Sequence, residues 1–145
     1  MIDFEEFVDQ VVDARWTDLS DRPKLETAMK LLCERMPEDV FDNLPRIVVF
    51  APTPWTSSWK EHGKVMPIPS NAVGAMIYFS PYLEEQPQGY SDFTVAHEFA
   101  HAFLHHYESM MSPEPLNYLD SPNEIAADQL VQQWGYVLPD YRSRR

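Results

Sequence analysis

The spacing of apolar residues predicts two helices near the start of the chain. Within residues 3–16, phenylalanine and valine recur every three or four positions with acidic residues between them, which is the period of an amphipathic helix. A second helix is expected to begin near Ser20 and Asp21, which can cap it, with Pro23 in its first turn. Apolar residues continue its stripe at Leu25, Met29, Leu32 and Met36. Such stripes are typical of helices that pack on a core.

Two short apolar runs predict a small sheet in the middle of the chain. Residues 47–50 and residues 75–80 have the length and composition of buried strands. The segment between them, residues 51–74, holds four prolines and two tryptophans. A loop this long inside a compact domain is uncommon and often forms a lid or a binding segment, although part of it could pair as an edge strand.

Two further helices follow the sheet. Ser91 or Asp92 can cap a helix that runs to about residue 107. Asp120 or Ser121, with proline next, can start a last helix that reaches about residue 134. This order of elements predicts an α+β fold, with N-terminal helices, a small mixed sheet and a final pair of helices packed together.

Composition fits one domain that spans residues 1–145. Apolar residues make up 44% of the chain, there is no internal repeat, and no stretch approaches the length needed to cross a bilayer. The acidic N-terminus does not resemble a secretory signal. Cys33 is the only cysteine, which excludes an intramolecular disulfide and fits a reducing compartment. We therefore expect a cytoplasmic protein that does not associate with membranes.

The charge distribution argues against direct nucleic-acid binding. Net charge is −12, and residues 65–141 contain no Lys or Arg but ten Asp or Glu. A surface that follows a phosphate backbone needs the opposite sign. The excess either serves solubility or attracts a basic partner. The basic residues at positions 142–145 are expected to be a frayed tail.

The strongest chemical signal is the run His97-Glu98-Phe99-Ala100-His101. In a helix, side chains four residues apart lie one turn apart on the same face, so two imidazoles can chelate one metal ion. Glu98 projects beside them, where it can take a proton from water bound to the metal. The alternative is a pair of helix-surface histidines next to an ordinary glutamate. The histidines that follow, at positions 105 and 106, are expected to be exposed residues at the helix end.

A catalytic zinc site needs a third protein ligand and one open position. Glu124 and Asp128 are the candidates, although Ser121 and Glu124 also match a capping box, in which Glu124 merely closes the helix start. Both carboxylates share the apolar face of the last helix, and no Lys or Arg lies near them in the sequence. A metal ion bound by Glu124, with Asp128 accepting a ring N–H from one of the metal-binding histidines, would satisfy both carboxylates.

These motifs resemble a known family. Residues 93–101, Phe-Thr-Val-Ala-His-Glu-Phe-Ala-His, and residues 124–128, Glu-Ile-Ala-Ala-Asp, resemble the ImmA/IrrE family of zinc metallopeptidases. They are similar more broadly to the gluzincins, whose third ligand is a glutamate followed four residues later by an aspartate. The resemblance covers about residues 75–138. Ala100 stands where the family often has glycine, and residues 129–131 differ from the usual Phe-Ala, which loosens the subfamily assignment.

The resemblance implies a zincin-like zinc metalloendopeptidase. His97, His101 and Glu124 would hold Zn2+, and Glu98 would be the catalytic base. Family members commonly cleave or help to inactivate transcriptional repressors, so a repressor with a basic segment is the expected substrate. Such a segment could add to the edge of the strand at residues 75–80.

Two questions stay open at the level of sequence. The group that stabilises charge on the substrate carbonyl could be Tyr90, Tyr107, Tyr118 or His62. The alternative to an enzyme is a non-catalytic acidic protein with structural zinc, which sequesters a basic partner. A closed fourth ligand would favour that alternative.

Overall fold

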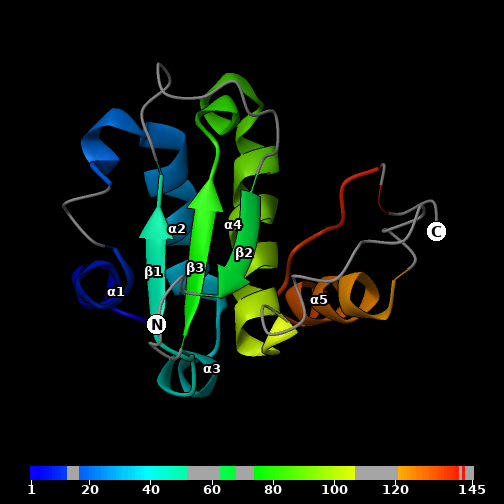
Figure 1. Ribbon diagram of the computed structural model, residues 1–145. Coiled ribbons are helices and arrows are strands. Elements are labelled where there is room, and N and C mark those ends of the chain that lie inside the picture. The colour runs from blue at the N-terminus through cyan, green and yellow to red at the C-terminus, as the bar shows by residue number, and fades with distance from the viewer. Residues whose placement is uncertain (13–16, 52–62, 68–73, 107–120, 141, 143–145) are drawn as a thin grey trace.

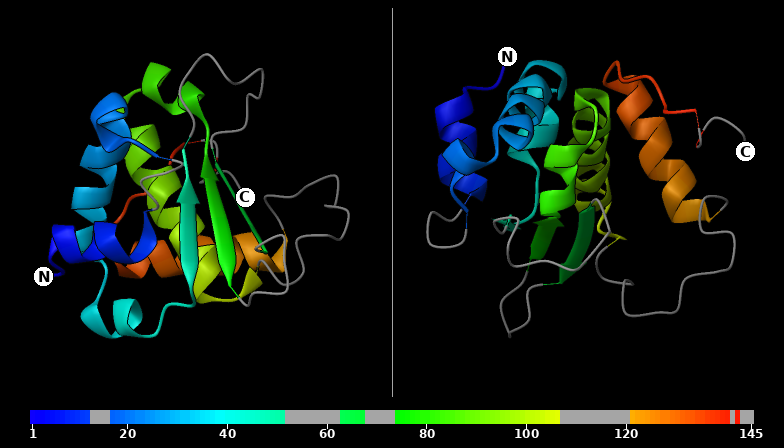
Figure 2. Two further views of the ribbon diagram at one scale, coloured as in Figure 1. Left: turned by 60° about the vertical axis from the view of Figure 1, so that its left-hand side comes forward. Right: turned by 90° about the horizontal axis from the view of Figure 1, so that it is seen from above.

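The structure is a computed structural model that describes residues 1–12, 17–51, 63–67, 74–106, 121–140 and 142. Helices pack in one layer on one face of a three-stranded sheet (Figures 1 and 2). This arrangement confirms the predicted α+β fold. Within the described residues, no helix is long and apolar enough to cross a membrane.

The sheet is mixed and has the strand order β1-β3-β2. Strand β1 (Ile47–Phe50) pairs in parallel with β3 (Ala75–Phe79), and β2 (Gly63–Pro67) pairs antiparallel with the other side of β3. Part of the segment 51–74 thus forms an edge strand. The prediction that a substrate adds to the edge of β3 is wrong, because β3 is the central strand and both of its edges are already paired.

The described part of the chain contains five α-helices and two short 3-10 helices. The α-helices are α1 (Phe4–Val11), α2 (Pro23–Arg35), α3 (Glu38–Asp42), α4 (Gln88–Phe103) and α5 (Pro122–Gln133), and the 3-10 helices are η1 (Leu19–Asp21) and η3 (Pro81–Glu85). The short helices α3 and η3 have no counterpart in the predicted elements, since each is too short to show an apolar period.

The core lies between the sheet and the helices, and one side of α4 packs against it. Strand β1 alternates, with Ile47 and Val49 buried, so its apolar side faces inward. Phe99 of α4 is fully buried, and its ring centroid lies 5.3 Å from that of Phe7 in α1. Helix α4 runs between α2 and α5, with β2 beside it (Figure 1). The histidine-bearing helix is therefore held from several sides.

Two predicted helix starts need correction. Helix α4 begins at Gln88 rather than after Ser91 or Asp92, because the Ser91 hydroxyl is buried and donates a hydrogen bond to the Leu83 carbonyl at 3.2 Å. Neither Ser20 nor Asp21 caps α2, since both belong to η1. The predicted end of α4 near residue 107 is also too late, because His105 adopts a left-handed backbone conformation with φ 59°.

Candidate metal centre

Helix α4 places both histidines of the motif on its side that faces α5. His97 and His101 are one turn apart, and their ring centroids lie 4.5 Å from each other with the rings nearly perpendicular. Both side chains are buried, with 6% and 2% of their surface exposed. Phe93, one turn before His97, stacks on the His97 ring at a centroid distance of 5.3 Å. Burial and stacking together restrict the orientation of these rings.

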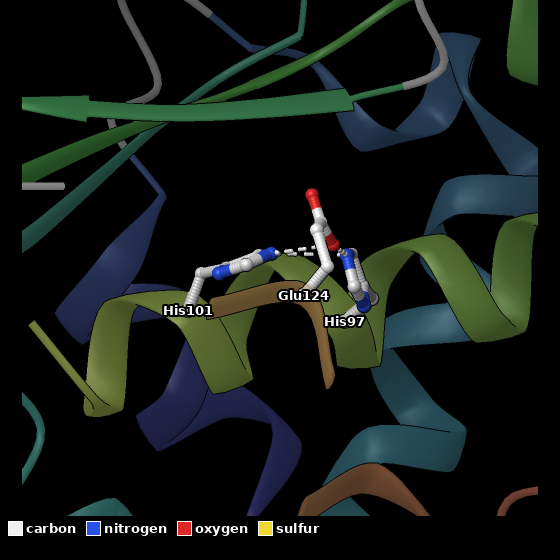
Figure 3. Close-up of side chains that lie close together, drawn as sticks. All are labelled: His97, His101 and Glu124. Carbon is white, nitrogen blue, oxygen red and sulfur yellow. Dashed lines mark hydrogen bonds and ion pairs between the residues drawn. The ribbon is translucent and has the colours of Figure 1, made fainter. Parts of the chain in front are cut away.

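Helix α5 supplies a carboxylate to the same place. Ser121 caps the helix, and its hydroxyl accepts a hydrogen bond from the Glu124 backbone N–H at 3.3 Å. The Glu124 side chain points toward the two histidines instead of back along its own helix (Figure 3). Among the described residues, no hydrogen bond from the Ser121 N–H to this carboxylate is present, so only half of a capping box forms.

Three potential ligand atoms converge at the contact between the two helices. The Nε2 atoms of His97 and His101 are 3.0 Å apart, and Glu124 Oε2 lies 2.8 Å from the first and 3.1 Å from the second. Figure 3 shows the two rings and the carboxylate directed at one another. The sequence predicted these three residues as metal ligands, and the structure brings them together.

The donor set fits a zinc ion. Ligand atoms at about 2.0–2.1 Å from a tetrahedral zinc ion are separated from one another by roughly 3.3 Å. The three observed separations fall slightly below that value. Two imidazole nitrogens and one carboxylate oxygen are also ligands that zinc accepts in catalytic sites. Within the described residues, the group consists of these three side chains, and three protein ligands are the number typical of a catalytic zinc site.

The surroundings of Glu124 favour its ionised form. Burial alone would raise the pKa of this carboxyl, but hydrogen bonds with His101 and His97, together with their charges, lower it far below its usual range. A carboxylate that stays ionised is the form that binds a metal ion.

The pKa of Glu98 is shifted in the opposite direction, upward. Burial raises the pKa of Glu98, and the nearby charge of Glu124 adds to this effect, while His97, His101 and Arg142 oppose it. Only 8% of the Glu98 surface is exposed. Glu98 therefore lies within electrostatic range of the cluster in a poorly solvated position.

His106 supports His101 from the far side of its ring. The two Nδ1 atoms are 2.8 Å apart, a distance at which one nitrogen must donate to the other. Burial, followed by the charge of His101, lowers the pKa of His106 to about 4, so a neutral His106 can accept the proton on His101 Nδ1. His101 Nε2 then keeps its lone pair for the cluster. The prediction that His106 is an exposed helix-end residue is therefore wrong, because the turn at His105 folds it back.

Asp128 lies next to His97, as the sequence suggested for a supporting carboxylate. Its Oδ1 atom is 3.0 Å from His97 Nδ1. This contact has the distance of a hydrogen bond but not its alignment, since the buried Nδ1 has no hydrogen-bond partner among the described residues.

Arg142 is the residue that the sequence interpretation missed. It is not part of a frayed tail: 4% of its surface is exposed, and its guanidinium contacts both Asp128 and Glu124. The argument that these carboxylates lack a basic partner is therefore wrong. The sequence did contain one signal for this role. Arg142 is the first basic residue after Lys64, and it is therefore the Lys or Arg that lies nearest along the chain to Glu124 and Asp128. The carboxylates therefore do not need a metal ion as their cation. The argument for a metal ion depends instead on the convergence of His97 Nε2, His101 Nε2 and Glu124 Oε2.

The other candidate residues do not enter the described cluster. His62, Tyr107 and Tyr118 lie outside the residues that the structure describes. Tyr90 is in the first turn of α4, about 10 Å along the helix axis from His97 at 1.5 Å per residue. His105 is exposed, as expected.

Comparison with known proteins identifies a family. Residues 48–139 match the model of a peptidase family described as the IrrE N-terminal-like domain. No curated protein and no solved structure was found to match the chain. The matched region begins earlier than the resemblance read from the motifs, at β1, and it includes α4 and α5 with the three converging residues. Because this match covers more than half of the 145 residues, the chain belongs to the IrrE N-terminal-like family of metallopeptidases.

Proposed function

We propose that this protein is a zinc-dependent endopeptidase whose metal ligands are His97, His101 and Glu124. The observation that carries the proposal is the convergence of two Nε2 atoms and one carboxylate oxygen within 3.1 Å of one another. Three protein ligands with an open fourth position are typical of catalytic zinc, whereas structural zinc usually has four. Membership of a peptidase family supports hydrolysis of a peptide bond.

Each residue of the centre has a distinct role in this proposal. A bound zinc ion would act as a Lewis acid on the scissile carbonyl and would lower the pKa of a coordinated water. Glu98 accepts the proton of the attacking water and delivers it to the leaving amine. Asp128 faces the Nδ1 side of the His97 ring and supports it by charge and proximity, and His106 holds the His101 ring through the hydrogen bond between their Nδ1 atoms.

The substrate is proposed to be a protein with an extended basic segment, such as a transcriptional repressor. Strand β2 lies beside α4 and is at the edge of the sheet. Among the described residues no other strand pairs with its outer side, so an extended chain could add there. Since residues 65–141 carry no Lys or Arg, a basic segment would be attracted to this part of the molecule.

Substitution of Glu98 tests the catalytic role directly. Glu98→Gln should lose about 10²–10⁴-fold in turnover because general-base catalysis contributes that much. Zinc content should stay unchanged, since Glu98 is not among the three converging residues. Glu85→Gln, an exposed substitution at the end of η3, serves as the control and should keep full activity. Candidate repressors incubated with each variant would be examined for fragments by mass spectrometry.

The same experiment separates the enzyme from an acidic binding protein. If the wild-type protein inactivates a repressor without cutting it, and Glu98→Gln does so equally well, the peptidase proposal fails. A non-catalytic zinc protein that sequesters a basic partner would then explain the result.

A further inference from the structure

Arg142 joins the two carboxylates of α5. Its Nε atom contacts both oxygens of Asp128, at 3.1 and 2.9 Å, and one terminal nitrogen donates to Glu124 Oε2 at 2.8 Å. Asp128 and Glu124 are one helical turn apart, so one planar guanidinium can reach both. The side chain is almost fully buried, which makes these charge-assisted hydrogen bonds stronger than they would be in water.

Arg142 also reaches the histidine-bearing helix. Its guanidinium carbon lies 5.5 Å from the centroid of the Phe93 ring, and that ring stacks on His97 with an angle of 25° between the planes. One side chain thus contacts α5 through two carboxylates and α4 through an aromatic ring. Of these partners, Glu124 is one of the three converging residues, and Asp128 and Phe93 are each in contact with another of them, His97.

This arrangement bears on metal binding because the ligands need to be held before the ion arrives. A glutamate has three rotatable side-chain bonds, and ordering it on binding costs entropy that an existing contact removes. Glu124 Oε2 can accept the Arg142 hydrogen bond with one lone pair and keep the other for the ion. Arg142 also neutralises one of the two negative charges on α5, which lowers the cost of holding the buried Asp128 close to the half-buried Glu124.

We propose that Arg142 is a positioning residue of the metal centre, which fixes Glu124 as a ligand and Asp128 as the support of His97. This inference rests on the proposed zinc site. The family match ends at residue 139, so it assigns no role to Arg142. The residue reaches the site through a turn in which its backbone N–H bonds to the Pro139 carbonyl at 2.9 Å.

Zinc affinity, measured by competition with a chromophoric chelator, tests the inference without any assay of activity. Arg142→Ala should weaken zinc binding about 10–100-fold, the usual cost of removing a partner of a metal ligand. Arg142→Lys should remain closer to Arg142→Ala than to the wild type, because one ammonium cannot reproduce the planar fork. Circular dichroism would verify that each variant is folded.

Arg35→Ala is a matched control, because Arg35 is also an arginine that contacts the C-terminal part of the chain. Arg35 donates to the Gly135 carbonyl at 3.3 Å and lies over the Tyr136 ring, away from the converging ligand atoms. Its removal should leave zinc affinity within about twofold of the wild type, as expected for a site with no shared partners. A double-mutant cycle of Arg142→Ala with Asp128→Asn should show a combined loss smaller than the sum of the two.

The outcomes separate the inference from the proposed function. Wild-type protein that binds no zinc would overturn both. Wild-type zinc affinity in Arg142→Lys and Arg142→Ala would overturn the inference alone. So would an equal loss in Arg35→Ala, or fully additive losses in the cycle. If Arg142→Ala does not fold, wild-type affinity in Arg142→Lys is sufficient to reject the positioning role.

Discussion

Glu124 combines two structural roles that the sequence presented as alternatives. Its backbone N–H is capped by Ser121, as in a capping box. Its carboxylate does not complete that box but faces His97 and His101 and accepts a hydrogen bond from Arg142. The residue therefore belongs to the helix start through its backbone and to the candidate metal centre through its side chain. Two substitutions can separate these roles.

We predict that Glu124→Gln changes zinc affinity, whereas Ser121→Ala changes the stability of the fold. Glu124→Gln keeps the shape of the side chain but removes the charge of the proposed ligand, so zinc affinity should fall by at least about 100-fold while the helix persists. Ser121→Ala removes the cap and should lower the free energy of unfolding by about 1 kcal/mol with little change in zinc affinity. Chelator competition and urea unfolding measure the two quantities. Unchanged zinc affinity in Glu124→Gln would reject its role as a ligand.

At the scale of elements, contacts between distant segments decide where helices begin. Helix α2 has no side-chain cap of its own, and Glu84 of η3 accepts hydrogen bonds from the backbone N–H groups of Lys24 (2.9 Å) and Leu25 (3.3 Å). Glu84 also pairs with Arg22 at 3.3 Å. Arg22 is fully buried and donates to the carbonyls of Phe79 and Ser80 at 3.2 and 2.7 Å. Glu84 therefore joins the start of α2 to η3, and its partner Arg22 joins the same place to the end of β3.

Patterns within a few neighbouring residues predicted most of the helices and strands. The contacts of Glu84 and Arg142 join residues that are distant in the sequence, and no such pattern indicates them. The motif helix, the capped start of α5 and the strands β1 and β3 follow from apolar periodicity and cap residues over a few neighbouring positions. Glu84 lies about 60 positions from the helix that it caps, and Arg142 lies 14 from Asp128. Neither separation has a helical or strand period, so only the folded chain reveals these pairs.

The role of Glu84 predicts a large loss of stability on its removal. Glu84→Ala should lower the free energy of unfolding by about 2–3 kcal/mol, because it leaves the buried Arg22 without its carboxylate and two helix N–H groups without an acceptor. The neighbouring Glu85 is exposed, so Glu85→Ala should change stability by no more than about 0.5 kcal/mol. Urea unfolding would measure both. Similar small changes in the two variants would show that the Glu84 contacts do not stabilise the fold.

For the whole molecule, the candidate metal centre lies where two helices meet, beside the edge of the sheet. Helix α4 packs on the core through Phe99. Helix α5 contacts α4 through Glu124 and Asp128, which face the histidines, and through Arg142, which lies over Phe93. The three converging side chains are thus attached to rigid elements, as the proposed catalytic metal would require. The proposed route for an extended substrate is the outer edge of β2, next to α4.

The most direct test is the zinc content of purified protein, measured by elemental analysis. We predict about one zinc ion per wild-type chain, because two imidazole nitrogens and one carboxylate oxygen converge as the ligands of a catalytic zinc ion would. His97→Ala and His101→Ala should each lose the ion, whereas Glu98→Gln should retain it. Full zinc occupancy in both histidine variants, or none in a folded wild-type protein supplied with zinc, would contradict the assignment of this site.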